Sequence, residues 1–393
     1  MTPIARPPHV LELRSVRGTG GGPEKTILQG AARADPARFA VSVCYIRDRR
    51  DEAFGVTARA TGAAIDYQEI EERHSLDPSI WPALGRVIAD RRPDIIHAHD
   101  YKTNLLGLML WRATGVLPLS TAHGWTGHSR RERFVYYPFD KRVLARYPRL
   151  VAVSSDIRNE LVRHGARPER VTTILNGIDH RLFRREPARE AAERAALGID
   201  AGATVIGAVG RLEPQKRFDL LMDAVALLRP SRPDLRLVIV GDGSLRGALA
   251  SHMAARSLAD CCIFTGHTLD IAGVHHAFDL FVQSSDYEGT PNAVLEAMAL
   301  ESPIVATGVG GTAELALDGV HGVIVEPGDA RILADAITST LADPPAARRR
   351  ARAARSRIER ELSFDARMQH LEAVYEEMME NAAGSPAFAG SYS

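Results

Sequence analysis

Two glutamates separated by seven residues are the most informative feature of this 393-residue sequence. Glu288 lies in a segment that reads YEGTPN, and Glu296 follows in an apolar, helix-like run. This composition predicts a loop that leads into a helix, with Thr290 as the cap and Pro291 at the first helical position. The free N–H groups of a helix start attract phosphate oxygens. Carboxylates beside a polyanion then make sense as acceptors of hydroxyl protons, one from a sugar and one from a ribose diol.

A cationic loop earlier in the chain points to the same ligand. Arg211 and Lys216 follow an apolar, strand-like run that ends at Gly210. A guanidinium fork and an ammonium group at this spacing can hold the two phosphates of a diphosphate. Open α/β sheets bind their ligands at the carboxyl ends of strands, where both loops are expected. The alternative is that these are two ordinary surface cations.

A glycine-rich loop follows the first apolar run of the chain and reads GTGGGPEK over residues 18–25. Glycines allow a backbone to approach a phosphate closely. The loop lacks the GK[ST] ending of a Walker loop, and a proline occupies the last glycine position of a dinucleotide fingerprint. A phosphate contact and a tight strand-to-helix turn both remain open for it.

The elements around these motifs alternate between short apolar runs and longer amphipathic stretches. Such alternation predicts a parallel sheet covered by helices, and the pattern restarts after a charged, alanine-rich stretch at residues 177–200. We therefore expect two doubly wound α/β domains. The strand-like runs are Val10–Val16, Phe39–Tyr45, Ile95–Ala98 and Leu150–Val153, and then Thr204–Gly210, Leu235–Val240, Ile263–Thr265, Leu280–Gln283, Pro303–Ala306 and Gly322–Val325.

The composition is that of an ordinary globular enzyme. Apolar residues make up 45% and charged residues 25%, and the formal net charge is zero, which gives no argument for a nucleic acid partner. The three cysteines suit neither a disulfide framework nor a four-ligand zinc site. There is no apolar stretch of membrane-spanning length and no signal-peptide core, so we expect a cytoplasmic protein.

The histidines allow more than one interpretation. His97, His99 and Asp100 form an HAHD segment at a strand end, and alternation places both imidazoles on one face. A metal site, a role in lining the acceptor side of a cleft, and a structural role all remain open. No third and fourth ligands are evident, so we predict no metal. The pair His275–His276 is expected on a helix surface.

Basic residues cluster in two places. Residues 128–149 interleave arginines with aromatic residues, which suits a packed helix with exposed arginines or an anionic membrane surface. RNA binding has no further support in the sequence. The run Arg348–Arg357 is expected to be a solvated helix face, followed by a helix near Phe364–Met379.

Taken together, these motifs resemble the retaining GT-B glycosyltransferases of the group 1 superfamily, family 4. Residues 284–307 read SSDYEGTPNAVLEAMALESPIVAT, close to that family's EGxPNxxLEAMAxGxPVVAT pattern. Further matches follow in the family's order along nearly the whole chain. They include DIIHAHD at 94–100, TAHG at 121–124, ILNGID at 174–179, GRL-x3-K at 210–216, VGDG at 240–243, FTGH at 264–267 and VGGTAE at 309–314. Arg217 and Glu301 stand where the family often has glycine.

The resemblance implies a role for each matching residue. Arg211 and Lys216 would bind the donor diphosphate, and Glu288 would bind the transferred sugar, with His123 beside that sugar. The remaining donor-binding positions would be Gly20, Gly21, Gly22, Gly266, His267, Gly289, Thr290, Pro291, Asn292 and Glu296. Glu24, His99 and Asp100 would lie on the acceptor side. The donor would be a UDP- or GDP-sugar, with no metal or other cofactor required.

The resemblance also implies an architecture. Residues 1–180 would form a Rossmann-like acceptor-binding domain, and residues 181–362 a Rossmann-like nucleotide-sugar-binding domain that faces it across a cleft. A helix at 363–380 would return to the first domain, and residues 381–393 would form a disordered tail. The acceptor would be a glycan or a lipid-linked sugar of bacterial polysaccharide or glycolipid synthesis, which would allow peripheral contact with an anionic membrane.

Three other functions remain open at this point. A GT-B sugar-nucleotide 2-epimerase would share the fold and the donor. A glycoside hydrolase would use Glu288 and Glu296 as acid and base. It would, however, have no need for the cations at Arg211 and Lys216, because a neutral glycoside carries no diphosphate. A non-catalytic binding protein could have kept the fold.

Overall fold

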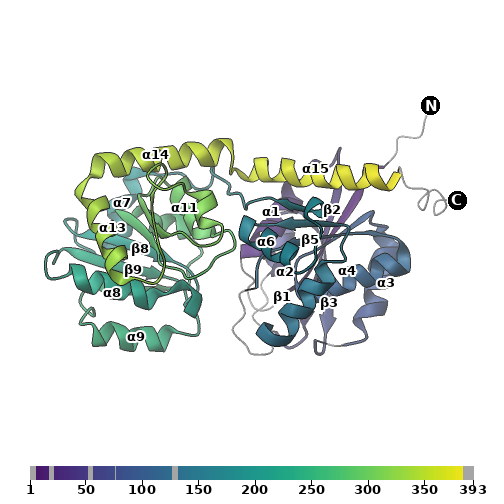
Figure 1. Cartoon of the computed structure of the whole chain (residues 1–393), viewed down its shortest axis with the longest axis horizontal. Coiled ribbons are helices and arrows are strands. Elements are labelled where there is room, and N and C mark those ends of the chain that lie inside the picture. Colours follow the sequence, from purple (N-terminus) through teal and green to yellow (C-terminus); the bar gives the residue numbers. More distant parts are fainter. Residues whose placement is uncertain (1–5, 17–21, 52–55, 76, 126–131, 384–393) are drawn as a thin grey trace. The chain divides into compact units, whose positions relative to one another are not determined.

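A computed structural model describes residues 6–16, 22–51, 56–75, 77–125 and 132–383 (Figure 1). Its internal contacts divide the chain into two compact units, residues 1–174 with 367–393 and residues 175–366. The sequence-based boundary at residue 180 lies close to this division. No helix in the described part of the chain is long and apolar enough to cross a membrane.

The first unit contains a seven-stranded parallel sheet in the order β3-β2-β1-β4-β5-β6-β7. The strand order reverses between β1 and β4, where doubly wound sheets bind their ligands. The strands are β1 (His9–Val16), β2 (Ala40–Asp48), β3 (Asp66–Glu72), β4 (Ile95–Ala98), β5 (Leu117–Ala122), β6 (Arg149–Ala152) and β7 (Val171–Thr173). The helices are α1 (Gly22–Arg33), α2 (Val56–Gly62), α3 (Ile80–Arg91), α4 (Tyr101–Thr114), α5 (Tyr137–Leu144) and α6 (Ser155–Arg163), with a π-helical turn η1 (Glu132–Tyr136) before α5.

The two faces of this first sheet differ in polarity. Leu11 belongs to the apolar core under α3 and α4. Glu12 points to the opposite face because side chains alternate along a strand, and its register partner is His97 on β4. Helix α15 (Phe364–Ala383) covers this second face and brings the hydroxyl of Tyr375 to 3.1 Å from Oε1 of Glu12 (Figure 1). The expected return of the last helix to the N-terminal unit is therefore confirmed.

The second unit contains a six-stranded parallel sheet in the order β10-β9-β8-β11-β12-β13. The order reverses between β8 and β11, which places a second ligand edge at their carboxyl ends. The strands are β8 (Thr204–Val209), β9 (Leu235–Val240), β10 (Cys262–Gly266), β11 (Leu280–Gln283), β12 (Ile304–Thr307) and β13 (Val323–Val325). The helices are α7 (Glu190–Ala196), α8 (Phe218–Leu228), α9 (Arg246–Ala255), α10 (Ile271–His276), α11 (Asn292–Ala299), α12 (Thr312–Leu315), α13 (Ala330–Ala342) and α14 (Pro344–Arg360).

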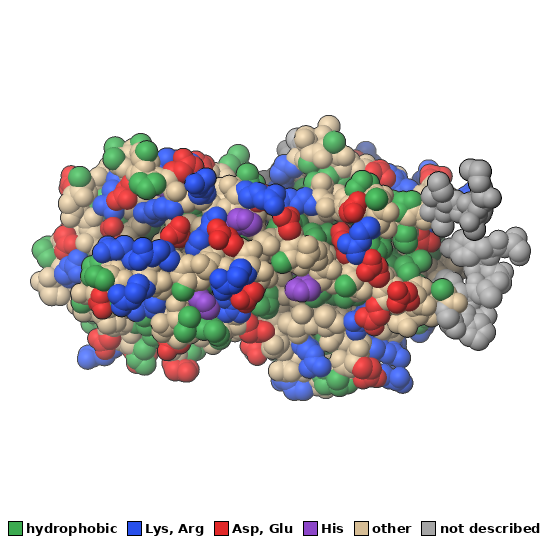
Figure 2. All heavy atoms as spheres, turned by 90° about the horizontal axis from the view of Figure 1, so that it is seen from above, with side chains coloured by type: hydrophobic (Ala, Val, Ile, Leu, Met, Phe, Trp, Pro, Cys, Tyr) green, Lys and Arg blue, Asp and Glu red, His purple; other side chains and the backbone are tan. Residues whose placement is uncertain are grey.

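The basic run is an amphipathic helix, as expected. Ala347, Ala351 and Ile358 of α14 are buried, whereas Arg348 and Arg352 are exposed. Lys and Arg side chains gather on the face of the second unit that α14 covers (Figure 2). The expectation of two parallel sheets covered by helices is thus confirmed in both halves of the chain.

The expectation for His275 and His276 was wrong, because both side chains are buried at the end of α10. The ring of His276 accepts a hydrogen bond from the backbone N–H of Glu186 at 2.9 Å. The ring of His275 packs between Phe278 and Phe281. The helix has only six residues and packs closely on its neighbours, so it buries even the two polar side chains at its end.

Candidate functional site

A buried ion pair joins the two sequence motifs at the ligand edge of the second unit. Lys216 ends the 3-10 turn η4 (Pro214–Lys216), and its Nζ lies 2.5 Å from Oε1 of Glu288. The same Oε1 accepts hydrogen bonds from the hydroxyl of Ser285 at 2.7 Å and the side-chain amide of Gln283 at 3.1 Å. Within the described residues, every hydrogen bond of this carboxylate falls on Oε1. Its Oε2 is therefore the oxygen that can accept a hydrogen bond from a ligand hydroxyl.

Arg211 lies directly after β8 on the same edge. Its side chain is exposed and makes no hydrogen bond or ion pair with any described residue. Gly210 precedes it, and a Cβ at this glycine would lie 3.2 Å from Cε of Lys216. The glycine thus lets the lysine stem lie against the strand end. The edge therefore offers one cation paired with Glu288 and one exposed cation, which is a suitable arrangement for a diphosphate.

The helix after Glu288 begins at Asn292, as the sequence suggested, but its cap differs from the predicted one. Pro291 is the N-cap of α11, with an extended backbone and no capping hydrogen bond from its own side chain. The prediction of Thr290 as cap was therefore wrong, because the proline occupies the cap position itself. Asn292 is the first helical residue, and the N–H groups of a first helical turn have no acceptor inside the helix. Glu296 lies one turn further along and is 7% exposed.

Two glycine loops hold this edge together through close backbone contacts. Gly310 has a φ of 52°, and a Cβ there would lie 1.9 Å from the carbonyl oxygen of Glu288. Its neighbour Gly311 donates from its N–H to the carbonyl of Gly289 at 2.7 Å. The VGGT segment therefore supports the backbone that carries Glu288. On the other side, a Cβ at Gly241 would lie 2.0 Å from the carbonyl oxygen of Gly210.

Gly266 and His267, the remaining predicted donor residues of the second unit, lie at the same edge. Gly266 ends β10 in a left-handed conformation with a φ of 75°, and its carbonyl accepts from the N–H of Gly241 at 2.9 Å. His267 follows and is exposed. The structure therefore brings together the second-unit positions that the sequence singled out, from β10 across β8 to α11. Their roles in binding remain predictions.

A layer of buried polar side chains lies at the ligand edge of the first unit. Nε2 of His99 makes a short hydrogen bond to Oε2 of Glu12. Nδ1 of His99 lies 3.1 Å from Nε2 of His123, whose side chain is half-buried. His97 is fully buried beside them, and its Nε2 lies 2.7 Å from the hydroxyl of Thr121. Burial lowers the pKa of His99 to about 4 and also lowers that of His123.

The other predicted first-unit residues have structural partners. Oδ1 of Asp100 caps α4, and its Oδ2 accepts from the N–H of Ser15 at 2.7 Å. Oε1 of Glu24 accepts from Nε of Arg14 at 2.6 Å, in a buried ion pair. Gly22 opens α1, whereas Gly20 and Gly21 lie outside the described residues.

Sequence reasoning missed two members of the polar layer, Glu12 and Tyr375. Glu12 had a detectable signal, because a carboxylate in the middle of an apolar strand is unusual. Nothing in the sequence near Tyr375 connects it to residues more than 270 positions earlier. Glu12 is also the third candidate metal ligand that was not evident from the sequence around His97 and His99. Its carboxylate and the two imidazoles have ligand atoms within 4.8 Å of one another.

The hydrogen bonds of this cluster nevertheless describe a polar network. Both ring nitrogens of His97 and both of His99 already have a hydrogen-bonding neighbour. A site of this kind suits proton positioning better than metal binding.

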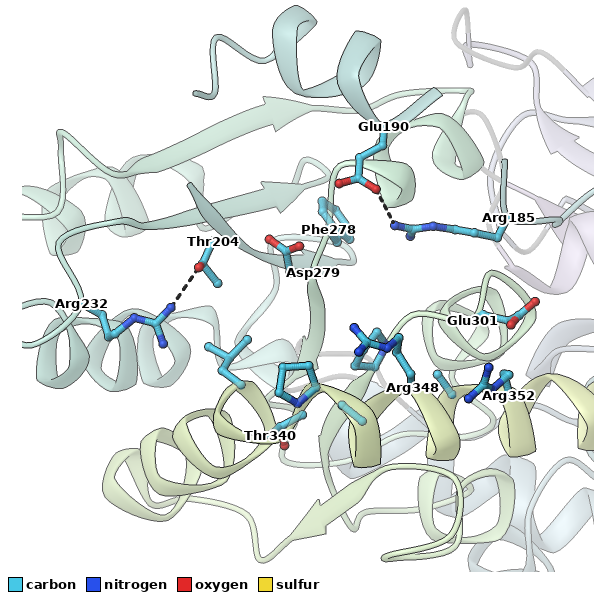
Figure 3. Close-up of a pocket in the computed structure, with 15 residues that line it drawn as sticks. Arg185, Glu190, Thr204, Arg232, Phe278, Asp279, Glu301, Thr340, Arg348 and Arg352 are labelled. Carbon is cyan, nitrogen blue, oxygen red and sulfur yellow. Dashed lines mark hydrogen bonds and ion pairs between the residues drawn. The ribbon is translucent and has the colours of Figure 1, made fainter. Parts of the chain in front are cut away.

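A hollow of about 570 Å³ lies at the opposite edge of the second sheet (Figure 3). Thr204 and Asp279 mark the amino ends of β8 and β11 in its wall, and Arg185 reaches across it toward Glu190. None of the residues predicted to bind the donor or the acceptor lines it, although Glu301 and two arginines of the basic run, Arg348 and Arg352, do. Ligands of doubly wound sheets bind at the carboxyl edge, so this hollow is not the candidate site.

Comparison with known proteins assigns both halves of the chain. Residues 20–182 match the model of Glycosyltransferase Family 4, and residues 189–357 match that of Glycosyl transferases group 1. The chain is 31% identical to a D-inositol 3-phosphate glycosyltransferase of Frankia alni, over 74% of this chain and 77% of that protein. It is 32% identical to the lipopolysaccharide core biosynthesis mannosyltransferase LpsB of Rhizobium meliloti, over 53% of this chain and 61% of the relative.

Solved structures share the fold. The structure of Anabaena Alr3699/HepE in complex with UDP-glucose superimposes with a TM-score of 0.80 at 22% identity, and the match covers 93% of this chain and 99% of that one. A sucrose-phosphate synthase of Thermosynechococcus elongatus gives the same TM-score at 21% identity, over 95% and 100% of the two chains. The chain therefore belongs to the group 1, family 4 superfamily of glycosyltransferases and has the two-unit α/β GT-B fold.

Proposed function

We propose that the protein transfers a sugar, with retention of its anomeric configuration, from a UDP- or GDP-sugar to a glycan or lipid-linked acceptor. The observation that carries this proposal is the buried Lys216–Glu288 pair beside Arg211 and the start of α11. It combines cations for a diphosphate with a carboxylate oxygen for a hydroxyl at one strand edge. An enzyme that acts on a neutral glycoside has no use for the cations.

The residues act mainly by charge stabilisation and alignment. Arg211 and Lys216 would neutralise the charge that develops on the leaving diphosphate, together with the N–H groups of the first turn of α11. The departing phosphate would take the proton of the acceptor hydroxyl on the same face of the sugar. Glu288 would orient the sugar, and Glu296 would bind the ribose diol. These groups supply the positive charge that a metal ion supplies in other transferases, so the reaction would need none.

Known proteins with the same fold or family give the only indication of the nucleotide in the donor. The HepE structures contain UDP or UDP-glucose, and LpsB is named a mannosyltransferase. Among these descriptions only those of HepE name a nucleotide, and it is a uridine diphosphate. The relatives named above are transferases or a synthase, which favours transfer over epimerisation. Bacterial polysaccharide or glycolipid synthesis is the pathway class that we propose for the acceptor.

The stereochemical part of this proposal can be tested without knowing the acceptor. Transferases slowly hydrolyse their donors, and NMR of the anomeric proton shows which anomer of the sugar is released first. We expect the anomer of the donor from an α-linked UDP- or GDP-sugar in metal-free buffer with a chelator. Initial release of the inverted anomer would contradict retention, and loss of activity with the chelator would contradict metal independence. Conversion of the donor to its 2-epimer would favour the epimerase.

A membrane contact would bring the enzyme to a lipid-linked acceptor. The turn η1 and helix α5 expose an unusual number of apolar side chains, with Phe134 70%, Val135 56% and Phe139 49% exposed. Arg142 of α5 and Arg146 just after it are also exposed. Aromatic side chains next to arginines suit the headgroup region of an anionic bilayer. We therefore propose that this part of the first unit makes peripheral contact with the inner face of the cell membrane.

Vesicle co-sedimentation at low salt tests this contact. Phe134→Ser with Phe139→Ser should lower binding to phosphatidylglycerol vesicles, since these aromatic rings would enter the lipid interface. Leu227→Ser is the matched control, because Leu227 is 49% exposed on α8 of the other unit. No binding of the wild-type protein at low salt, or equal loss in the control, would exclude the contact.

A further inference from the structure

The buried polar layer of the first unit reaches the half-buried side chain of His123 through His99. We propose that Glu12, acting through His99, holds His123 in the tautomer with its proton on Nε2 and with Nδ1 as a hydrogen-bond acceptor. This inference rests on the proposed place of His123 beside the donor sugar. Glu12 and His99 are thereby positioning residues, because they act on the sugar only through His123.

The order of donors and acceptors follows from the chemistry of each group. An ionised carboxylate can only accept, so His99 must donate from Nε2 to Oε2 of Glu12. His99 is neutral near pH 7, since burial lowers its pKa to about 4. Its Nδ1 therefore carries a lone pair. Nε2 of His123, 3.1 Å away, must then be the donor of the second hydrogen bond.

The other oxygen of Glu12 anchors the carboxylate to the last helix. Tyr375 of α15 lies with its hydroxyl 3.1 Å from Oε1 of Glu12 and 2.9 Å from Nδ1 of His97. If the hydroxyl donates to Glu12, it accepts from His97, and the hydroxyl of Thr121 then donates to Nε2 of His97 at 2.7 Å. Every group in this arrangement has a compatible partner. The carboxylate therefore turns Oε1 to Tyr375 and to Nδ1 of His97, which lies 3.2 Å away, and turns Oε2 to His99.

This order of donors and acceptors decides the state of Nδ1 of His123, the last ring nitrogen in the chain of hydrogen bonds. Nδ1 of His123 makes no hydrogen bond within the described residues, and the side chain is only half-buried. Burial lowers the pKa of His123, so the free nitrogen stays unprotonated near neutral pH. It can accept a hydrogen bond from a sugar hydroxyl and cannot donate one to a phosphate oxygen. The relay thus suits His123 to recognise a hydroxyl group.

Nitrogen NMR of the imidazole rings tests the tautomer directly. In protein labelled with ¹⁵N-histidine and assigned with His123→Gln, the ring of His123 should give the pattern of an Nε2–H tautomer. Glu12→Gln presents an amide that can donate to His99, so a mixture with the Nδ1–H tautomer is expected. The kcat/KM for donor should then fall roughly ten-fold, the value of one hydrogen bond of ordinary net strength. Glu12→Asp, which keeps the charge, should restore much of the wild-type pattern.

The matched control is Glu72→Gln, because Glu72 is also buried in this unit and its ion pair is with Lys102. It should leave the His123 tautomer unchanged. An Nδ1–H tautomer in the wild-type protein would overturn the inference even if Glu12→Gln fails to fold, and so would an unchanged tautomer in folded Glu12→Gln. The spectrum does not depend on turnover. If the predicted tautomer is found but His123→Gln leaves the donor KM unaltered, the proposed role of His123 fails and the relay stands.

Discussion

A single buried imidazole should make the second unit sensitive to acid. His275 is fully buried in α10, with its ring centroid 5.0 Å from that of Phe278 and 5.5 Å from that of Phe281. Neither ring nitrogen has a hydrogen-bond partner within the described residues. Burial in this apolar setting lowers the pKa of His275 to about 3. We therefore predict that His275→Leu stabilises the protein, and more strongly at low pH.

The size of the effect follows from proton linkage. An ordinary histidine in the unfolded chain titrates near pH 6.5, so the unfolded state gains a proton as pH falls below that value while folded His275 stays neutral until about pH 3. The folded state is thus fully favoured above pH ~6.5 and loses stability on acidification. Between about pH 8 and about pH 5 the expected loss is about 2 kcal/mol. Removal of unsatisfied buried nitrogens should add about 1–3 kcal/mol at either pH.

Urea unfolding followed by far-UV circular dichroism measures both contributions. The free energy of unfolding of His275→Leu should exceed that of the wild-type protein at about pH 8, and the difference should grow by about 2 kcal/mol at about pH 5. His252→Leu serves as the control, since His252 is part-exposed and is hydrogen-bonded to Asp223. An equal difference at both pH values would refute the proton linkage, and a destabilised variant at both would refute the cost of the unsatisfied nitrogens.

Two further substitutions test the strand edge that carries the proposed donor site, and a third tests backbone strain just after the end of α11. Lys216→Ala should lower turnover roughly 1,000-fold in a donor–acceptor assay, because it removes a fixed cation from the leaving diphosphate; wild-type activity would exclude this role. Gly310→Ala places a methyl group on the carbonyl of Glu288, and should raise the donor KM and lower the melting temperature; an unchanged KM would show that the loop does not support the site. Glu301→Gly should stabilise the protein by about 1 kcal/mol, or about 2–4 °C, because Glu301 has a φ of 53°; calorimetry that shows no increase would argue against strain at this position.

Much of the fold was predictable because hydrophobic periodicity reports burial directly. The strand over Leu280–Gln283 and the helix from Asn292 have the expected bounds to within a residue. The positions of Arg217 and Glu301, which replace the family's glycines, are also informative. Both residues have a positive φ, so the glycine preference at these positions has a conformational cause.

The parts that could not be predicted depend on contacts between distant residues. Glu12, His97 and Tyr375 meet because two strands and the last helix stack in three dimensions, and no local pattern encodes that meeting. The burial of His275 has the same origin, since two adjacent histidines on a short helix look like a polar surface. At the start of α11 the N-cap is Pro291, although threonine is the more usual residue at such a position.

Calorimetric titration with UDP and GDP tests the central claim most directly, because it depends on neither the acceptor nor turnover. If the ligand edge of the second unit binds the donor, one of these diphosphates should bind with a dissociation constant of roughly 1 μM to 1 mM. Arg211→Ala should weaken that binding at least about ten-fold without loss of stability, since the side chain of Arg211 is exposed and makes no hydrogen bond or ion pair with a described residue. Arg348→Ala, on the exposed face of α14, should bind as the wild-type protein does. Absence of binding to either diphosphate, or unchanged binding by Arg211→Ala, would contradict the account.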